Sequence, residues 1–449
     1  MNCSERLCEK LEKLFWFFLF INPFLDIFNG LYINKVMNVD VLDVKFTSTL
    51  GVTPSLVVRM VMLIIFALYV LAARDKKSIM TALPIGLAWL MSMVSEYVSV
   101  HSVPVFLDTQ YAARFCYNIV LLMVYTRVFA HRWGENGTEL IRKLNDAAAF
   151  TLFILSLSIL ASAVVGVGYS TYADRLGYRG SRGFFYAGND ITAVLALLLP
   201  VVFAALMQLE NSDGRVRTAL YAAAAGLGAN ALVIIGSKTA FIAFGVTIAL
   251  MLVAFIIICL RRRSLAGEPV RFLIGIGAVA VVFAALMVLS DMKLWYSIVN
   301  SYNVTGELAE TEGMSTAILS GRQFKLREHL DRFVSGGIMT WLFGLGRGSV
   351  SEILEMDVFE VVFYYGIFGA AAMLWLYGKM AIDFFKSFLR RKDVMSAALF
   401  ASLAMCAGYL IMAGHILFSV TSGFYFIFVI VYSRAYFARS EKDVLLWNR

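Results

Sequence analysis

Residues 239–260 have the sequence TAFIAFGVTIALMLVAFIIICL, an unbroken apolar run without a charged side chain. A helix of about 20 apolar residues is long enough to cross the hydrocarbon core of a bilayer. The rest of the 449-residue chain is similar in character, because 60% of its residues are hydrophobic and only 16% are charged. Soluble domains are about 25% charged, so this composition excludes a water-soluble enzyme and a disordered chain.

Apolar runs of this kind recur along the whole chain, separated by short polar segments. They predict about twelve membrane-spanning helices, near residues 14–33, 53–73, 79–98, 111–130, 145–168, 189–209, 218–235, 239–260, 272–290, 358–380, 394–413 and 415–434. The last two runs have almost no loop between them. We therefore expect an all-α fold, a polytopic transmembrane helical bundle that forms a single integral membrane domain over residues 1–449.

The basic residues predict how these helices are oriented, because cytoplasmic loops carry an excess of Lys and Arg. With a cytoplasmic N-terminus and alternating spans, the short inner loops hold most of the basic residues, including Arg261, Arg262 and Arg263. Both termini are then expected to be cytoplasmic. Most of the net charge of +8 follows from this topology, so it gives no reason to expect a nucleic-acid partner.

One predicted outer connection, residues 291–357, is several times longer than the others. Loops of this length without secondary structure are uncommon unless they are functional. Within it, Phe324, Leu326, Leu330 and Phe333 recur at roughly helical spacing. We therefore expect this large extracytoplasmic loop to contain an amphipathic helix, over about residues 321–333, that lies on the membrane surface.

The residue types that commonly bind metals are dispersed along the chain. The five cysteines form no CxxC pair and the four histidines are equally scattered, so neither a zinc site nor a disulfide framework is expected. The run GLGRG at residues 344–348 imitates a phosphate-binding loop but follows no strand of a βαβ unit. We interpret it as a tight turn and not as a nucleotide site.

Basic residues also occur in the predicted outer loops, against the topological bias. They include Arg175, Arg179, Arg182, Lys238, Arg322, Lys325, Arg327 and Arg332. Arginine presents a rigid fork of donors that matches phosphate oxygens, so this set suits the pyrophosphate of a lipid-linked substrate, whose negative charge must be stabilised as it departs. The alternative is pairing with lipid headgroups or with local acids such as Asp174, Glu328 and Asp331.

Four charged residues lie inside or at the edges of predicted spans: Arg59, Arg114, Asp26 and Glu96. Charges within a bilayer are costly and usually face a polar interior or a partner. Arg59 is therefore a candidate to bind substrate, and structural pairing with Asp26 is the alternative. Lys238, where a span begins from the outer face, either extends to the membrane interface or points its charge into an outward cavity.

An acidic group, Glu352, Glu355, Asp357 and Glu360, ends the long loop and enters the next span. Glycosyl transfer needs a base that takes the proton from the attacking hydroxyl, and Asp357 and Glu360 would share one helix face. The alternative is that these acids stabilise a helix N-terminus. His329, the histidine of the large loop, is a further candidate base, although a solvated surface histidine is the simpler interpretation.

Several short motifs occur in order along most of the chain: NPFLD at 22–26, TPSL at 53–56, RG at 182–183 followed by GND at 188–190, GSKTA at 236–240, SGR at 320–322, LFGLG at 342–346 and YGIFG at 365–369. Together they resemble the O-antigen ligase and polymerase superfamily of bacterial envelope glycosyltransferases, membrane enzymes of the GT-C type. In GSKTA, Lys238 stands where the family element has arginine.

The resemblance implies an enzyme that acts on undecaprenyl-pyrophosphate-linked glycans at the outer face of the bacterial cytoplasmic membrane. It also implies that Arg182 and Arg322 contact the pyrophosphate or the glycan. The ligases have a His-Asn pair near the end of the large loop, whereas the matching residues here are Glu355, Met356 and Asp357. This departure favours a polymerase in which a carboxylate is the base.

The resulting hypothesis is a Wzy-like polymerase that joins lipid-linked oligosaccharide units into surface polysaccharide without a metal, nucleotide or other cofactor. Its candidate catalytic residues are Arg182, Arg322, Asp357 and Glu355, and its candidate substrate-binding residues are Arg175, Arg179, Lys238, Arg327, His329 and Arg59. The expected partners are lipid-linked glycans and membrane lipids, with flippase and chain-length regulator proteins as further candidates.

Two alternatives stay open at this point. The first is a ligase that transfers finished polysaccharide to a lipid or wall acceptor. The second is a flippase or another transporter of lipid-linked oligosaccharides. Transporters usually have pseudo-symmetric halves, and the sequence contains no obvious inverted duplication.

Overall fold

The computed structural model describes residues 3–33, 53–73, 76–172, 179–262, 267–311, 313–350, 352–391, 393–414 and 416–445. Most of them lie in helices, which confirms the all-α prediction. The helices of the bundle are α1 (Cys3–Leu31), α2 (Pro54–Ala72), α3 (Lys76–Val100), α4 (Val105–Val165), α5 (Gly188–Gln208), α6 (Arg215–Ile235), α7 (Lys238–Arg262), α8 (Glu268–Leu289), α13 (Asp357–Arg390), α14 (Val394–Met412) and α15 (Ser422–Phe437). Ten helices of the described chain are long and apolar enough to cross a membrane.

Each predicted span coincides with a helix, although two of them share one. α4 contains most of the runs 111–130 and 145–168, on either side of a break in helical geometry at Asn136 (φ −160°, ψ 96°). A straight helix of 61 residues would be about 90 Å long, about three times the hydrocarbon core, so each arm of α4 corresponds to one span. The last two runs are separate helices, α14 and α15, and α15 has only 16 residues.

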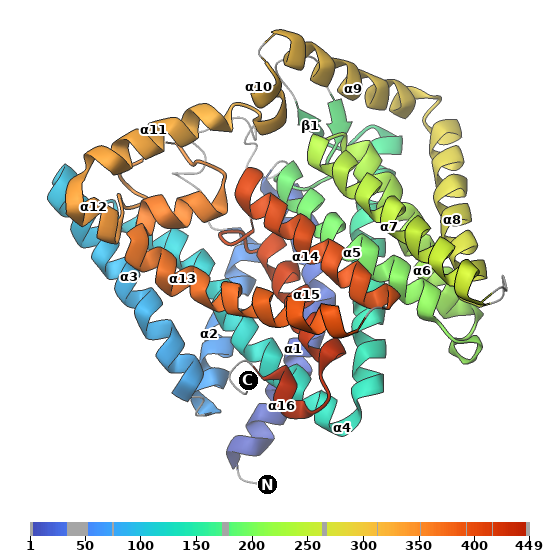
Figure 1. Ribbon diagram of the computed structural model, residues 1–449, viewed down its shortest axis with the longest axis horizontal. Coiled ribbons are helices and arrows are strands. Elements are labelled where there is room, and N and C mark those ends of the chain that lie inside the picture. Colours follow the sequence, from blue (N-terminus) through green and yellow to red (C-terminus); the bar gives the residue numbers. More distant parts are fainter. Residues whose placement is uncertain are drawn as a thin grey trace.

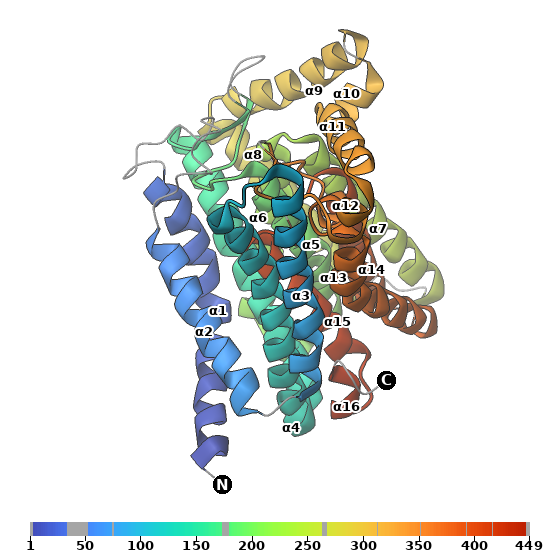
Figure 2. The same ribbon diagram turned by 90° about the vertical axis from the view of Figure 1, so that its left-hand side faces the viewer.

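The two ends of the bundle differ in what covers them. Both chain termini lie at one end, whereas α9 (Lys293–Thr311), α10 (Met314–Leu319), α11 (Arg322–Ser335) and α12 (Gly337–Phe343) cover the opposite end (Figures 1 and 2). We call these the termini end and the loop end. The long connection is therefore largely helical and forms a cap over one end of the bundle.

The amphipathic helix expected over residues 321–333 is α11, Arg322–Ser335. Its apolar residues do not form a single face, however. Phe333 is buried, whereas Phe324 is 68% exposed and Leu330 is 46% exposed. The predicted stripe included Phe324 and Leu326, and side chains two positions apart on a helix do not share a face.

The run at residues 344–348 is a turn that is fixed to α13. The N–H groups of Leu345 and Gly346 donate to the carbonyl oxygens of Phe363 (2.8 Å) and Tyr364 (3.1 Å). α13 breaks helical geometry at Gly366, where φ is 69°, and a Cβ atom there would lie 2.4 Å from the Leu342 carbonyl oxygen. The missing side chain of Gly366 therefore lets α12 and the turn pack directly against α13.

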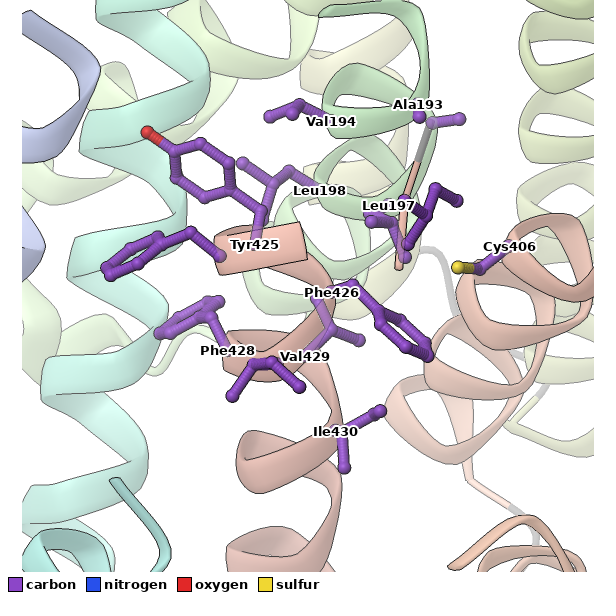
Figure 3. Close-up of a cluster of buried hydrophobic side chains, with 14 of the residues drawn as sticks. Ala193, Val194, Leu197, Leu198, Cys406, Tyr425, Phe426, Phe428, Val429 and Ile430 are labelled. Atoms are coloured by element: carbon purple, nitrogen blue, oxygen red, sulfur yellow. The ribbon is translucent and has the colours of Figure 1, made fainter. Parts of the chain in front are cut away.

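The apolar core of the bundle surrounds α5, whose residues from Ile191 to Met207 are all buried. Figure 3 shows Leu197 and Leu198 of α5 among Phe426 of α15 and Cys406 of α14. Within a bilayer, helices associate through close packing because lipid tails are as apolar as leucine side chains. This core provides a rigid base for the helix ends that meet at the loop end.

Candidate functional site

A cavity of about 220 Å³ opens at the loop end of the bundle. The C-terminal part of α1, the N-terminal parts of α2, α4 and α13, the start of α5 and residues 418–421 before α15 all contribute to its wall. The N-terminus of a helix carries a partial positive charge and unpaired N–H groups. Several helices present their N-terminal turns here, which favours a negatively charged ligand, while Asp26, Asp190, Asp357 and Glu360 add four acids to the same wall.

Residues 418–421 line one wall of the cavity, and acids from three different helices hold the segment 416–421 to which they belong. The Oδ2 atom of Asp357 accepts the N–H groups of residues 416 (2.7 Å) and 417 (2.8 Å). The Oγ of Ser419 donates to Asp190 at 3.0 Å, and the Oγ1 of Thr421 donates to Asp26 at 2.6 Å. This wall is therefore fixed by α13, α5 and α1 together.

Arg59 and Asp26 form a buried ion pair in the cavity wall. Arg59 also donates to the Oδ1 of Asn22 at 3.1 Å, and Asp26 accepts from Tyr425 at 3.3 Å. The structural pairing expected as the alternative for Arg59 is thus present. Because Asp26 already neutralises its charge, Arg59 contributes to the wall mainly by fixing α1 against α2.

A second arginine in the wall, Arg114 of α4, lies in different surroundings. In the described part of the chain, Arg59 and Arg114 are the cations that line the cavity, and no carboxylate there lies within ion-pair distance of Arg114. Burial raises the pKa of the Tyr186 hydroxyl, and the positive charges of Arg114 and Arg182 act in the opposite direction. Arg114 and Arg182 are therefore both close to Tyr186, which also lines the cavity.

Arg182 is positioned by a short β-hairpin of β1 (Ser170–Tyr172) and β2 (Arg179–Ser181), which pair antiparallel. The N–H group of Arg182 donates to the Tyr169 carbonyl at 2.9 Å. The next residue, Gly183, has φ 64°, and a Cβ atom there would lie 2.9 Å from the backbone of Ile159. The Arg-Gly pair therefore marks a tight turn between the hairpin and α5.

Arg322 and Glu355 form an ion pair beside the cavity, with 2.6 Å between Nη2 and Oε2. The Glu355 N–H donates to the Oε1 of Glu360 at 2.6 Å, and Glu360 lines the cavity and accepts from the hydroxyl of Tyr111. The Glu355 side chain is 33% exposed. This pair therefore connects the first turn of α11 to the cavity wall through Glu360.

Two further basic residues lie near Arg322. The Nζ of Lys238, at the start of α7, is 3.4 Å from the Oγ of Ser320, and Lys325 pairs with Glu352 at 3.3 Å. Arg322 and Lys325 thus pair with Glu355 and Glu352, and not with Glu328 or Asp331 as the alternative had suggested. The acids of the loop's last segment neutralise the first turns of α11.

His329 is buried, so the interpretation as a solvated surface histidine is wrong. Its Nδ1 lies 2.7 Å from the Lys325 carbonyl oxygen, and its Nε2 lies 3.3 Å from the Tyr364 hydroxyl. Burial lowers the pKa of His329. A neutral ring that donates from Nδ1 and accepts at Nε2 satisfies both contacts, so His329 fixes α11 to α13 and does not line the cavity.

The remaining predicted site residues contribute less. Arg327 is exposed on α11, and the Nη2 of Arg332 donates to the Ser349 carbonyl at 2.9 Å. Arg175 lies outside the described residues, and only the backbone of Arg179, in β2, is described. Among the described residues, no group of three or more His, Cys, Asp or Glu side chains is placed to hold a metal ion.

A family model described as "O-antigen ligase like membrane protein" matches residues 8–300 and 300–439 of the chain. The chain belongs to this family. No curated protein sequence matches it significantly. Family membership supports a multi-pass membrane enzyme of glycosyl transfer that acts in polysaccharide assembly on lipid-linked substrates, a description that covers polymerases and ligases alike.

For a member of the O-antigen ligase-like family, the structure brings forward residues that sequence reasoning had not selected. Tyr111 and Tyr186 line the cavity, but tyrosines are common throughout the chain and no spacing singles these out. Arg114 and Glu360 had been noticed only as a charge in a span and as one acid among four. The available signal was the position of both residues within apolar spans, because a charge inside a span usually has a function.

Proposed function

We propose that the protein polymerises undecaprenyl-pyrophosphate-linked oligosaccharide units at the loop end of the bundle, and that this end faces the outside of a bacterial cytoplasmic membrane. In this reaction, a sugar hydroxyl of the acceptor unit attacks the anomeric carbon of the donor glycan. The bond from that carbon to the pyrophosphate breaks, polyprenyl pyrophosphate leaves, and the hydroxyl proton passes to a carboxylate. The departing pyrophosphate supplies the driving force.

The observation that carries this proposal is Arg114, a cation in a cavity wall whose four acids, Asp26, Asp190, Asp357 and Glu360, are already bonded to other protein groups. Helix N-termini converge there, and Arg114 has no carboxylate within ion-pair distance among the described residues. A pyrophosphate would supply the missing counter-charge through charge-assisted hydrogen bonds, which are roughly twice as strong as neutral ones. Arg182, on the same side near Tyr186, is the second cation proposed to stabilise the leaving group.

Glu355 is the carboxylate proposed as the base. Asp357 is buried, and one of its oxygens already accepts two backbone N–H groups, so its proposed role is to position residues 416–421. Glu355 is partly exposed, and its carboxylate is paired with Arg322. When the pyrophosphate attracts Arg322, the Glu355 carboxylate is released and becomes more basic.

The alternative within the family is a ligase that transfers finished polysaccharide. The resemblance places a His-Asn pair of the ligases where this chain has Glu355 and Asp357, and His329 has both ring nitrogens in contact with protein groups away from the cavity. These observations support carboxylate chemistry and therefore the polymerase. A flippase and a chain-length regulator are the proposed partner proteins, because they would deliver units and limit the product.

Purified protein in detergent tests the reaction with one lipid-linked oligosaccharide as both donor and acceptor. A ladder of products on a gel supports the polymerase. No turnover until a different acceptor is added supports the ligase, and no turnover with any acceptor contradicts enzymatic function and favours a transporter.

Arg322→Ala tests the proposed site in cells. We expect it to abolish polymer and to leave single lipid-linked units, because Arg322 controls Glu355 and contacts the leaving group. Arg142→Ala is the matched control, since Arg142 is exposed at the termini end with a 3.5 Å contact to Asp213. Unchanged polymer length in Arg322→Ala, at equal protein levels in the membrane, contradicts the proposal.

A further inference from the structure

Two carboxyl groups lie next to each other at the loop end, outside the cavity. Glu96, in the last turns of α3, is 0% exposed, and Asp108, in the first turn of α4, is 2% exposed. Neither residue is part of the reaction proposed above. Burying an ionised carboxylate costs several kcal/mol unless it is paired or well hydrogen-bonded, so the partners of these two groups decide their charge.

The turn at residues 344–348 is seated directly on both groups. The Oδ1 of Asp108 accepts the N–H of Arg347 at 2.8 Å and that of Gly348 at 3.2 Å. A Cβ atom on Gly346 would lie 2.3 Å from the Oε2 of Glu96, and one on Gly348 would lie 2.6 Å from the Oδ2 of Asp108. The glycines of this run therefore allow the backbone to approach the two carboxyl groups closely.

The other oxygens of the pair have no donor. Among the described residues, nothing donates a hydrogen bond to Oε1 or Oε2 of Glu96 or to Oδ2 of Asp108. The two carboxyl groups nevertheless face each other, because Oε2 of Glu96 contacts Gly346 and Oδ2 of Asp108 contacts Gly348, two positions along the same turn, and each group acts on the other. Ionised carboxylates are acceptors only, so a hydrogen bond between these two groups exists only when one of them carries a proton.

No nearby positive charge replaces that proton. Arg347 is the cation that acts on Glu96, but its Nη1 donates to the Val350 carbonyl at 2.7 Å. Its guanidinium lies 5.6 Å from the ring centre of Tyr111 and 5.9 Å from that of Tyr364. In the described part of the chain, Arg347 lies beyond ion-pair distance of either carboxylate.

The titratable groups that face the pair from α4 and α13 add no positive charge. They are Tyr111 on α4 and Glu360, Tyr364 and Tyr365 on α13. Glu360 is itself a buried acid and accepts from Tyr111 and from the Glu355 N–H. With both members ionised, the Glu96–Asp108 pair would thus add two buried negative charges, while the guanidinium groups of Arg347 and Arg332 donate to the carbonyls of Val350 and Ser349 and, among the described residues, form no ion pair with either acid.

We propose that Glu96 and Asp108 form an acid pair that shares one proton, and that this proton holds the turn at residues 344–348 in place. The shared proton satisfies the facing oxygens and leaves Oδ1 of Asp108 free to bind the turn. Through the turn the pair positions Arg347, which packs on Tyr111, and Tyr111 in turn holds Glu360 in the cavity wall. Glu96 and Asp108 are positioning residues and not catalytic ones.

Infrared spectroscopy of the purified full-length protein tests the shared proton without any substrate, so its result is independent of the proposed reaction. We expect a protonated-carboxyl band at neutral pH that loses intensity in Glu96→Gln and equally in Asp108→Asn. In either variant an amide N–H supplies the donor that the proton had supplied, so the fold is retained. Glu9→Gln, an exposed acid at the termini end, is the control and should leave the band unchanged.

The pH dependence of thermal unfolding provides the second readout. Raising the pH removes the shared proton and leaves two buried charges, so the unfolding temperature of the wild type should fall, and that of Glu96→Gln should fall less. The proposal is overturned if neither amide variant changes the carboxyl band. It is also overturned if added Mg²⁺ or Na⁺ raises the wild-type unfolding temperature but not that of Glu96→Gln, because the pair then binds a metal cation.

Discussion

The two ends of the bundle carry their charges in different ways. At the termini end, several ion pairs are local and exposed, since Lys13 pairs with Glu9 and Arg132 with Glu135 within four residues on one helix, and the partly exposed Arg217 of α6 also pairs with Asp146 of α4. At the loop end, charged groups are buried and join elements that are distant in sequence. There, Asp26 pairs with Arg59, and Asp357 binds the backbone of residues 416 and 417.

This difference separates exposed charges that pair locally from buried charges that hold distant elements together. Exposed ion pairs contribute about 0–1 kcal/mol each to the free energy of unfolding. A single exposed pair at the termini end therefore contributes little to stability. Removing one member of a buried pair costs about 3–5 kcal/mol, because the other charge is left without a partner. A buried charge is stable only where a partner charge or hydrogen bonds compensate for the lost contact with water. At the loop end, the groups that provide these partners lie around the cavity.

The largest expected effect on stability is that of Arg59→Met. It leaves Asp26 buried without its guanidinium and should lower the free energy of unfolding by about 3–5 kcal/mol, measured by denaturant titration in detergent. Adding Asp26→Leu to this variant should restore part of the loss, since no uncompensated charge is left. A loss below about 1 kcal/mol in Arg59→Met would show that this buried pair contributes no more to stability than an exposed pair at the termini end.

A smaller effect is expected from acidification acting on His329. Burial lowers its pKa, so the folded protein holds a neutral ring while the unfolded chain binds a proton below about pH 6.5. Stability is therefore complete above that pH and declines as the pH falls toward the lowered value. Hydrogen exchange should show α11 losing protection on acidification in the wild type, but much less in His329→Gln. Equal losses in both proteins would contradict this assignment.

The smallest effect is expected from Lys13→Ala at the termini end. Lys13 and its partner Glu9 are 66% and 48% exposed, and exposed i,i+4 pairs are worth about 0.3–0.5 kcal/mol. The free energy of unfolding should change by no more than this, and polymer length should be unchanged. A loss of several kcal/mol in Lys13→Ala would contradict the claim that exposed ion pairs at the termini end contribute little to stability.

Much of the fold could be predicted from the sequence, because hydropathy is a local property. The apolar runs gave the helices of the bundle, including both arms of α4 and the separate helices α14 and α15. The possible pairing of Asp26 with Arg59 also followed from the rule that charges inside spans need partners. These inferences require no knowledge of how the helices are arranged.

The candidate site could be predicted only in part, because its contacts depend on that arrangement. Arg322 and Glu355 were both selected, but their pairing depends on how α11 lies over the start of α13. The same packing buries His329, which no local pattern indicates. The wall at residues 416–421 needs acids from three helices, so a single sequence contains no spacing that could reveal it.

Binding of undecaprenyl pyrophosphate to the purified protein tests most directly whether the cavity at the loop end is the site of the lipid-linked donor. Arg114→Ala should bind it about 10- to 100-fold more weakly than the wild type, because it removes a charge-assisted contact worth about 1.5–3 kcal/mol. Arg142→Ala, at the termini end, should bind like the wild type. Equal affinity of Arg114→Ala and the wild type, or an equal loss in Arg142→Ala, would contradict this assignment.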